Sequence, residues 1–448
     1  MRRSKKKLKE GLIVGILFGI SFLLRVFYII YTPHHIRQHD SYLTGSDGGH
    51  LAYIEHFLKN GFAMPDFDPR LVEQFYHPPL HHFLAALWLK ANSFIGIDYL
   101  NAVENIQILT LLYSCACTWI CYLIMKEFYL VRLGLIIPFS IICFHPTLII
   151  LSGSINNDIL CLLLMLSSIL FAIRWYKRPS IVTILLTAVY LGLAIMTKMS
   201  GLLIVIPIGL LFLCKIIQEK QYYRKYLFQC LVFGLVCFSI GMWRSIYCLV
   251  EYGMPINYIL RLGEGAQWQF IGNYSIWERV FVPDLHLMES IFVLLNPVND
   301  YNILLGALKT SMFGEYFLYQ NNPSLLLPAT VLFYCNIILV ITSLICILWA
   351  LKKKNISDNM FLNWFLFSTF MIIFGSYFKF CLDFPHICTQ DFRYIAITFM
   401  IGTFFLGFFI NTIQNKQSLW SKAVLYFVLC NSLIFCIGSF CTYILLGL

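Results

Sequence analysis

The sequence predicts an all-α polytopic integral membrane protein, and three observations carry this prediction. Of the 448 residues, 59% are hydrophobic and only 12% are charged, and the mean hydropathy is +0.76. A soluble domain of this length would carry about twice that charged fraction. Several apolar runs also reach the roughly 18 residues that a helix needs to cross a hydrocarbon core of about 30 Å.

Hydropathy in windows of about 19 residues predicts about eleven transmembrane helices, within a range of roughly nine to thirteen. The first run is too long for the apolar core of a signal peptide, and we interpret it as a retained signal anchor. The predicted spans are Gly11–Tyr31, Ala102–Met125, Leu133–Leu151, Ile159–Ile173, Ile181–Thr197, Gly201–Leu213, Tyr226–Tyr247, Leu325–Leu351, Met360–Tyr377, Tyr394–Ile413 and Val424–Leu445.

Lysine and arginine predict the orientation of these spans, because short cytoplasmic segments carry an excess of both. With a cytoplasmic N-terminus, 20 of the 32 basic residues fall in such segments. All acidic residues except Glu10, Glu127, Glu219 and Asp358 then lie outside or near the outer face, as do all 11 histidines. We expect a multi-pass protein of the cell membrane with its polar chemistry outside. The basic residues lie in short segments between the apolar spans and do not form one patch, which argues against a nucleic-acid partner.

The spans divide the chain into alternating membrane and outer parts. Two outer loops are too long to be simple connectors, and long ordered loops usually carry function. Amphipathic stretches at His81–Phe94 and Ser275–Leu295 predict interfacial helices in these loops. The predicted organisation is a cytoplasmic N-terminus at residues 1–10, the first span at 11–31, an outer catalytic loop at 32–101, spans two to seven at 102–247, a second outer loop at 248–324, and spans eight to eleven at 325–448.

The first outer loop is rich in groups that can do chemistry. In Asp47-Gly48-Gly49-His50 a carboxylate stands at a turn just before a helical run, where the helix dipole favours its ionised form. An ordinary helix N-cap is the alternative role for Asp47. The loop's histidines leave a divalent metal open, but no HxH or HExxH spacing fixes its ligands. These histidines are His34, His35, His39, His50, His56, His77, His81 and His82.

At these residues the chain resembles the GT-C glycosyltransferases that use polyprenyl-phosphate sugars. The most similar groups are protein O-mannosyltransferases, lipid A aminoarabinose transferases and bacterial lipopolysaccharide galacturonosyltransferases. Their first outer loop carries a DExH motif, matched here by Asp47 and His50, and an HPPL or KPPL element, matched by His77-Pro78-Pro79-Leu80. Gly48 departs from the pattern, since the mannosyltransferases carry Glu there.

The resemblance continues in order along the chain. It covers the first 260 or so residues and thins afterwards. The matching segments are Asn156-Asn157-Asp158, Thr197-Lys198-Met199-Ser200-Gly201, Trp243-Arg244 with Tyr252-Gly253-Met254-Pro255, and Asp391-Phe392-Arg393-Tyr394. Each ionised residue also has a plain structural reading, as a helix cap for Asp158 or as an interfacial anchor for Lys198 and Arg244. Ionisable groups at the membrane boundary are nevertheless functional candidates.

The resemblance implies a GT-C fold and an inverting transfer of a hexosyl or pentosyl group. The donor is a polyprenyl-phosphate sugar and the acceptor an extracytoplasmic lipid, glycan or protein. Asp47 would be the base, with Asp40 as its rival, while His50 and Asp158, with Asn157, orient the substrates. Lys198 and Arg244 would bind the donor phosphate, with Arg393 and His77 as further candidates. No cofactor is required, because the leaving phosphate is already anionic and cations stabilise it.

Two other classes stay open, a transporter or lipid flippase and a non-enzymatic scaffold. A transporter would show internal repeats and charges near the membrane midplane, whereas the ionisable residues here avoid the span centres. A scaffold would need no convergence of Asp, His, Lys and Arg on one face. Bacterial proteins give the nearest resemblances, while Asn273-Tyr274-Ser275, an N-glycosylation pattern, leaves a eukaryotic host open.

Overall fold

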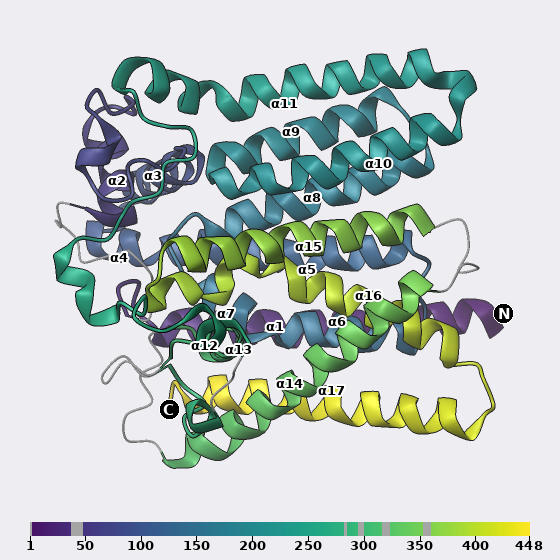
Figure 1. Ribbon diagram of the computed structural model, residues 1–448. Helices are drawn as coiled ribbons and strands as arrows, with labels where there is room; N and C mark the ends of the chain where they lie inside the picture. The colour runs from purple at the N-terminus through teal and green to yellow at the C-terminus, as the bar shows by residue number, and fades with distance from the viewer. Residues whose placement is uncertain (1, 37–47, 282–284, 294–299, 316–322, 353–359) are drawn as a thin grey trace. The chain divides into compact units, whose positions relative to one another are not determined.

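A computed structural model describes residues 2–36, 48–281, 285–293, 300–315, 323–352 and 360–448. The described chain folds into helices and contains no strand (Figure 1). The chain divides into two units, of which the first comprises Met1–Tyr31, Cys121–Ile150 and Leu262–Leu448 and the second comprises Thr32–Ile120 and Leu151–Arg261.

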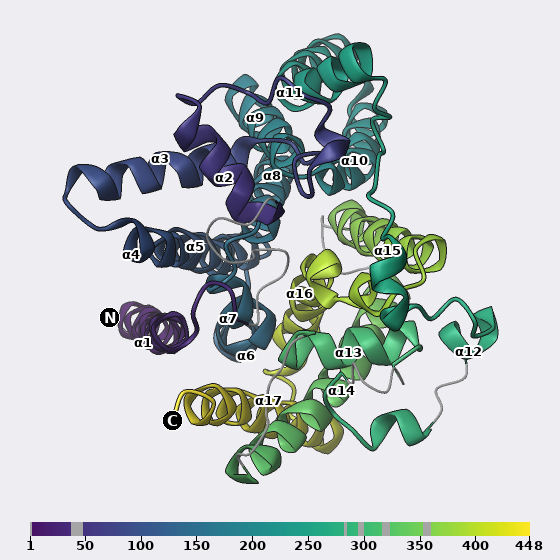
Figure 2. The ribbon, with the colours of Figure 1, turned by 90° about the vertical axis from the view of Figure 1, so that its left-hand side faces the viewer.

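The second unit carries most of the predicted site residues. Its α2 and α3 pack on one another, and α8, α9, α10 and α11 lie side by side in both ribbon views (Figures 1 and 2). The helices that it contains wholly or in part are α2 (Gly49–Lys59), α3 (Leu80–Phe94), α4 (Tyr99–Glu104), α5 (Ile106–Glu127), α7 (Pro146–Ser152), α8 (Asp158–Lys177), α9 (Ile181–Thr197), α10 (Val205–Gln218) and α11 (Tyr223–Tyr252).

Helix α9 is the centre of this group, because it packs along both α8 and α11. It begins after Ser180, whose hydroxyl accepts a hydrogen bond from the Thr183 amide and so satisfies one free N–H of the first turn. Gly192 faces α11 so closely that a Cβ there would lie 2.8 Å from Ile240 Cβ. The α9–α11 contact therefore depends on the missing side chain.

The first unit is built around long apolar helices. Buried Arg25 of α1 donates a 3.1 Å hydrogen bond to the Cys143 carbonyl, and the Tyr31 hydroxyl donates one of 2.8 Å to the Tyr443 carbonyl. The helices that this unit contains wholly or in part are α1 (Arg2–Tyr31), α5 (Ile106–Glu127), α6 (Leu133–Phe144), α7 (Pro146–Ser152), α12 (Ile276–Val280), α13 (Ile303–Phe313), α14 (Pro323–Lys352), α15 (Met360–Asp383), α16 (Ile397–Ile413) and α17 (Leu419–Leu445).

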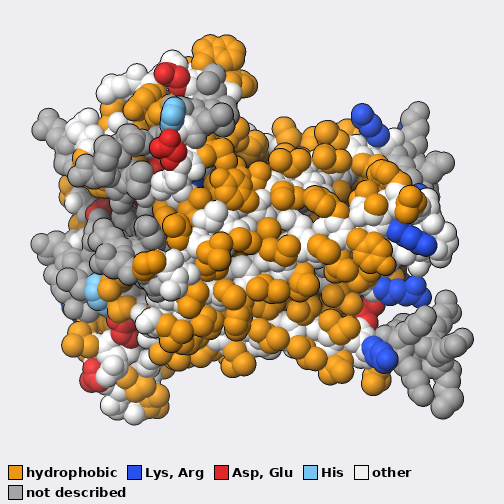
Figure 3. Space-filling view, turned by 90° about the horizontal axis from the view of Figure 1, so that it is seen from below, with side chains coloured by type: hydrophobic (Ala, Val, Ile, Leu, Met, Phe, Trp, Pro, Cys, Tyr) orange, Lys and Arg blue, Asp and Glu red, His pale blue; other side chains and the backbone are white. Residues whose placement is uncertain are grey.

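The prediction of a polytopic α-helical membrane protein is confirmed. Among the described residues, 8 helices are long and apolar enough to cross a membrane, and up to 10 are if each of two bent pairs forms one span. The predicted span Ile181–Thr197 is α9, which is 17 residues long. Apolar side chains cover much of the face drawn in Figure 3. On α11, for example, Leu231 and Leu235 are about 60% exposed, which suits contact with lipid tails.

The predicted interfacial helix at Ser275–Leu295 is wrong as a continuous element. The structure has only α12 (Ile276–Val280) and a short 3-10 turn at Leu285–Met288 among the described residues of this stretch. The sequence places Pro283 within the stretch, and a proline lacks the N–H that an interior helical position must donate. The other predicted interfacial helix, His81–Phe94, corresponds to α3.

We predict that Gly192→Leu destabilises the protein by about 1–3 kcal/mol, because the added side chain must push α9 and α11 apart. The exposed Gly209 of α10 provides a matched control, since a Cβ there meets nothing within 4 Å. Both changes raise helix propensity by the same amount. The apparent midpoint of thermal unfolding in nanodiscs should fall for Gly192→Leu only. Equal midpoints for the two variants would contradict the packing that we describe.

Candidate active site

Four histidines of the segment between α1 and α4 gather where α2 meets the start of α3. His50 lies in the first turn of α2, and His81 and His82 lie in that of α3. His50 Nδ1 is 2.8 Å from His82 Nε2. The rings of His50 and His77 stack with their centroids 5.7 Å apart. The rings of His50, His81 and His82 are buried.

The turns before the two helices position these rings. Gly49 has a φ of +89°, which an L side chain rarely adopts, and it lets the chain turn into α2 at His50. Pro79 is the N-cap of α3, where the missing N–H of a proline costs little. The two elements that the sequence singled out, around His50 and His77, are therefore both helix starts and lie together.

Burial lowers the pKa of the imidazoles. At His81 desolvation is the main cause, and it lowers the pKa to about 4. The hydrogen bond to the Ile155 carbonyl and the charge of Asp158 raise this pKa, but by less. Desolvation also holds the pKa values of His50 and His82 well below 6.5, with the neighbouring histidines as further causes. At neutral pH these rings are uncharged, so the His50–His82 contact joins one donor to one acceptor.

The Asn156-Asn157-Asp158 segment forms the buried start of α8. The Asn157 side-chain amide donates a 3.1 Å hydrogen bond to the carbonyl of Thr197, the last residue of α9. Asn156 accepts one of 3.1 Å from the Asp158 amide. The Asn157 side chain thus joins two helix ends, each of which leaves backbone groups unsatisfied.

Lys198 pairs with Asp158. The Lys198 ammonium donates to Asp158 Oδ1, and only 15% and 8% of the two side chains are exposed. The backbone of Lys198 is extended between α9 and the 3-10 helix Met199–Ile204. Gly201 lets this 3-10 helix pack closely against the end of α9. A Cβ at Gly201 would lie 2.8 Å from the Ile195 amide nitrogen. The Thr-Lys-x-x-Gly pattern is therefore a tight turn that aims the lysine at Asp158.

The segments that carry Arg244 of α11 and Lys198 are in contact. The residues that follow each of them are in contact, since the Ser245 hydroxyl donates a 3.3 Å hydrogen bond to the Met199 sulfur. Arg244 is only 3% exposed, and its guanidinium lies 5.2 Å from the Tyr247 ring centroid. Burial raises the pKa of Tyr53 in α2, and the positive charge of Arg244 acts on this pKa in the opposite direction. The guanidinium is thus close enough to α2 to act on Tyr53.

Several buried polar atoms around these residues make no hydrogen bond with the described part of the chain. Buried polar groups normally find partners, so such a concentration indicates a polar ligand. Two cations, neutral imidazoles and amides together suit an anion such as a phosphate. The atoms are Tyr53 Oη, His81 Nδ1, His82 Nδ1, Asn156 Nδ2, Asn157 Oδ1 and Arg244 Nη2.

One acidic neighbour was missed by sequence reasoning. Glu73 lies beside the start of α2, where its carbonyl accepts a 3.3 Å hydrogen bond from the Gly49 amide. A Cβ at Gly48 would lie 3.1 Å from Glu73 Cβ and 3.7 Å from its Oε2. The structure therefore brings a carboxylate to the place where a side chain at position 48 would project. Glu73 is distant from Gly48 in the sequence, so no local pattern predicts that the two residues are neighbours.

Three further residues that the sequence predicted for the site do not belong to the described part of the second unit. Asp40 and Asp47 lie outside the described residues, so their roles stay predictions. Arg393 belongs to the first unit, where its Nη2 donates a 2.9 Å hydrogen bond to the Tyr394 hydroxyl and its amide donates one of 2.7 Å to Asp391. The second unit thus brings together His50, His77, Asn157, Asp158, Lys198 and Arg244.

We predict that acid destabilises the fold through His81. The unfolded chain protonates this residue below pH 6.5, whereas the folded chain does so only near pH 4. The stability that neutral His81 contributes is therefore complete above pH 6.5 and is lost as the pH falls toward 4. The loss is about 2 kcal/mol at pH 5. The unfolding midpoint, measured between pH 7.5 and 5, should fall less steeply for His81→Gln, whose amide can still donate to Ile155.

His286→Gln is the control for this pH series, because 84% of the His286 side chain is exposed. It should leave the pH dependence of the midpoint as in the wild type. The same slope for wild type and His81→Gln would contradict a buried, neutral His81.

Solved structures with a similar fold belong to membrane glycosyltransferases. ArnT from Cupriavidus metallidurans, bound to undecaprenyl phosphate, has a TM-score of 0.50 at 12% identity, over 96% of this chain and 76% of that one. The oligosaccharyltransferase AglB from Archaeoglobus fulgidus, in complex with an inhibitory peptide and a dolichol-phosphate, has a TM-score of 0.50 at 14% identity. There the match covers 97% of this chain but 55% of the archaeal protein, so this chain spans about half of its length. A search of the curated proteins found no match.

Family membership comes from the sequence itself. The family model described as dolichyl-phosphate-mannose-protein mannosyltransferase matches residues 16–252, which is more than half of the 448 residues. The matched range contains every site residue that the second unit brings together. The predicted GT-C resemblance is confirmed by this match and by the shared fold. The chain belongs to the dolichyl-phosphate-mannose-protein mannosyltransferase family of GT-C membrane glycosyltransferases.

Proposed function

We propose that this glycosyltransferase moves a sugar from a polyprenyl-phosphate-linked donor to an acceptor on the outer face of the membrane. The observation that carries the proposal is the buried guanidinium of Arg244, whose Nη2 has no hydrogen-bond partner among the described residues. A buried charge is costly unless an anion pairs with it. A lipid phosphate supplies that anion, and a planar guanidinium binds phosphate oxygens in pairs.

The surroundings of Arg244 support the same ligand. Lys198 lies one residue from the Met199–Ser245 contact and adds a second cation. Asp158 already holds this lysine, so the ammonium is positioned before a donor arrives. The two similar structures were solved with undecaprenyl phosphate and with a dolichol-phosphate, which carry the same phosphate headgroup. His77, stacked on His50, is a further candidate to contact the phosphate.

The proposed reaction is a direct displacement at the anomeric carbon. The acceptor hydroxyl or amine forms a bond to this carbon, and the bond from the carbon to the phosphate oxygen breaks. The acceptor proton passes to the Asp47 carboxylate, and the electron pair stays on the polyprenyl phosphate. Arg244 and Lys198 stabilise the charge that grows on that phosphate. The configuration at the anomeric carbon is inverted.

Other groups orient the reactants in this proposal. His50 and Asp158, with Asn157, orient the donor or acceptor, while Asp40 is the alternative base and Arg393 a further phosphate ligand.

The transferred group is a hexosyl or pentosyl unit, and the acceptor is a lipid, glycan or protein of the cell envelope. The N-terminus is cytoplasmic and the host bacterial. No resident cofactor is needed, because the leaving phosphate is anionic before the reaction begins, and a divalent cation is compatible with it.

We predict that Asp47→Asn lowers turnover by about 10²–10⁴-fold, the usual contribution of a positioned general base. The amide removes the base but leaves the phosphate ligands, so donor binding should stay near the wild-type value. Purified protein in nanodiscs would be tested for transfer from polyprenyl-phosphate sugars and for donor binding by fluorescence. Asp40→Asn tests the alternative base, and it should keep turnover near the wild-type value if Asp47 is the base. Full activity of Asp47→Asn would remove this base from the mechanism.

We predict that Arg244→Leu weakens binding of polyprenyl phosphate, because a charged hydrogen bond to a buried phosphate is lost. A loss of about 1.5–3 kcal/mol corresponds to roughly 10–150-fold in Kd. Arg224→Leu is the control, since Arg224 is an exposed arginine near the opposite end of the same helix. Unchanged affinity in Arg244→Leu would exclude Arg244 as a phosphate ligand, whatever the turnover.

A further inference from the structure

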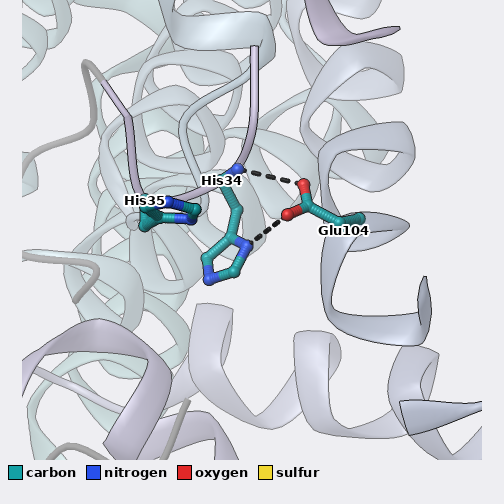
Figure 4. Close-up of side chains that lie close together, drawn as sticks. All are labelled: His34, His35 and Glu104. Carbon is teal, nitrogen blue, oxygen red and sulfur yellow. Dashed lines mark hydrogen bonds and ion pairs between the residues drawn. The ribbon is translucent and has the colours of Figure 1, made fainter. Parts of the chain in front are cut away.

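A second cluster of ligating side chains lies outside the phosphate site. His34, His35 and Glu104 each offer one ligand atom, and these atoms lie within 4.8 Å of one another (Figure 4). All three residues belong to the second unit. The two histidines follow α1 in the chain, whereas Glu104 is the last residue of α4. None has a role in the proposed sugar transfer.

The carboxylate of this cluster is held in place. Glu104 Oε1 is 2.7 Å from His34 Nδ1, and Glu104 Oε2 accepts a 3.0 Å hydrogen bond from the His34 amide. Gln107 donates a 2.8 Å hydrogen bond to the same Oε2 and one of 3.1 Å to the Thr32 carbonyl. Hydrogen bonds of this kind around a ligating carboxylate orient it and tune its affinity for a metal.

We propose that His34, His35 and Glu104 bind a divalent transition-metal ion of the Zn²⁺ class. Two imidazoles and one carboxylate are a donor set that Zn²⁺ accepts, with a water molecule in the fourth position. His34 is buried, while His35 is exposed and gives the ion access from the solvent. Bonds of about 2.0–2.2 Å to a tetrahedral ion hold the ligand atoms about 3.3–3.6 Å apart. His34 Nδ1 and Glu104 Oε1, now 2.7 Å apart, therefore separate slightly to admit the ion. Rotation of the exposed His35 side chain adjusts the position of the third ligand atom.

The ion would tie the segment after α1 to the end of α4. His34 and Glu104 are 70 residues apart in the chain, so a metal bridge between them constrains a long stretch of the second unit. This stretch includes the buried histidines around His50, whose rings do not belong to the metal cluster. The expected consequence is structural, namely a higher unfolding midpoint with zinc, and it does not depend on the sugar-transfer proposal.

The test uses the full chain in nanodiscs, with its affinity tag removed and its metals stripped by a chelator. Isothermal titration with ZnCl₂ should give one site per chain, and X-ray absorption at the zinc edge should report two imidazole ligands. His35→Ala is the decisive variant because the exposed ring can be removed without a cavity. It should weaken binding at least about 10-fold and reduce the imidazole count to one.

Further variants separate this site from other histidines. Glu104→Gln should also lose the site, and Gln107→Leu should weaken it about 10–100-fold. His56→Ala is the matched control from the same loop, since His56 hydrogen-bonds to Asn60 outside the cluster. It should bind zinc as the wild type does. Absence of zinc binding by the wild type would overturn the proposal, and so would affinity and imidazole count that are unchanged in His35→Ala.

Discussion

The ion pair between Lys198 and Asp158 is the interaction on which the polar end of the second unit depends. It joins the first residue of α8 to the residue after α9, and both side chains are mostly buried. Removing one partner of such a pair leaves an uncompensated buried charge, which costs about 3–5 kcal/mol. Asn157 reinforces the junction through the Thr197 carbonyl. The pair therefore fixes where the lysine ammonium stands before any ligand binds.

The charges around this pair are unequal. Asp158 neutralises Lys198, the buried histidines stay uncharged at neutral pH, and Arg244 has no ion-pair partner among the described residues of the second unit. Lowered imidazole pKa values matter here, because charged rings would repel both cations. A buried guanidinium without an ion-pair partner attracts an anion more strongly than the same charge in water would. The proposed phosphate ligand follows from this balance.

Much of the fold could be predicted from the sequence because hydrophobic length and charge placement are local signals. The starts of α2 and α3 could be predicted from Gly48-Gly49 and Pro78-Pro79, which are turn residues. The contacts of the site could not, because the Lys198–Asp158 pair joins residues 40 positions apart. Glu73 beside Gly48 and Glu104 beside His34 were missed for the same reason. The continuous helix predicted at Ser275–Leu295 was wrong, because amphipathic spacing alone does not register the missing N–H of Pro283 in this stretch.

The most direct test of the central claim is an experimental structure of the full chain with a polyprenyl phosphate. We expect the phosphate within hydrogen-bond distance of the Arg244 guanidinium and the Lys198 ammonium, with Asp158 still paired to Lys198. A phosphate that binds elsewhere, with the Arg244 guanidinium still without an anion, would rule out Arg244 and Lys198 as the phosphate site.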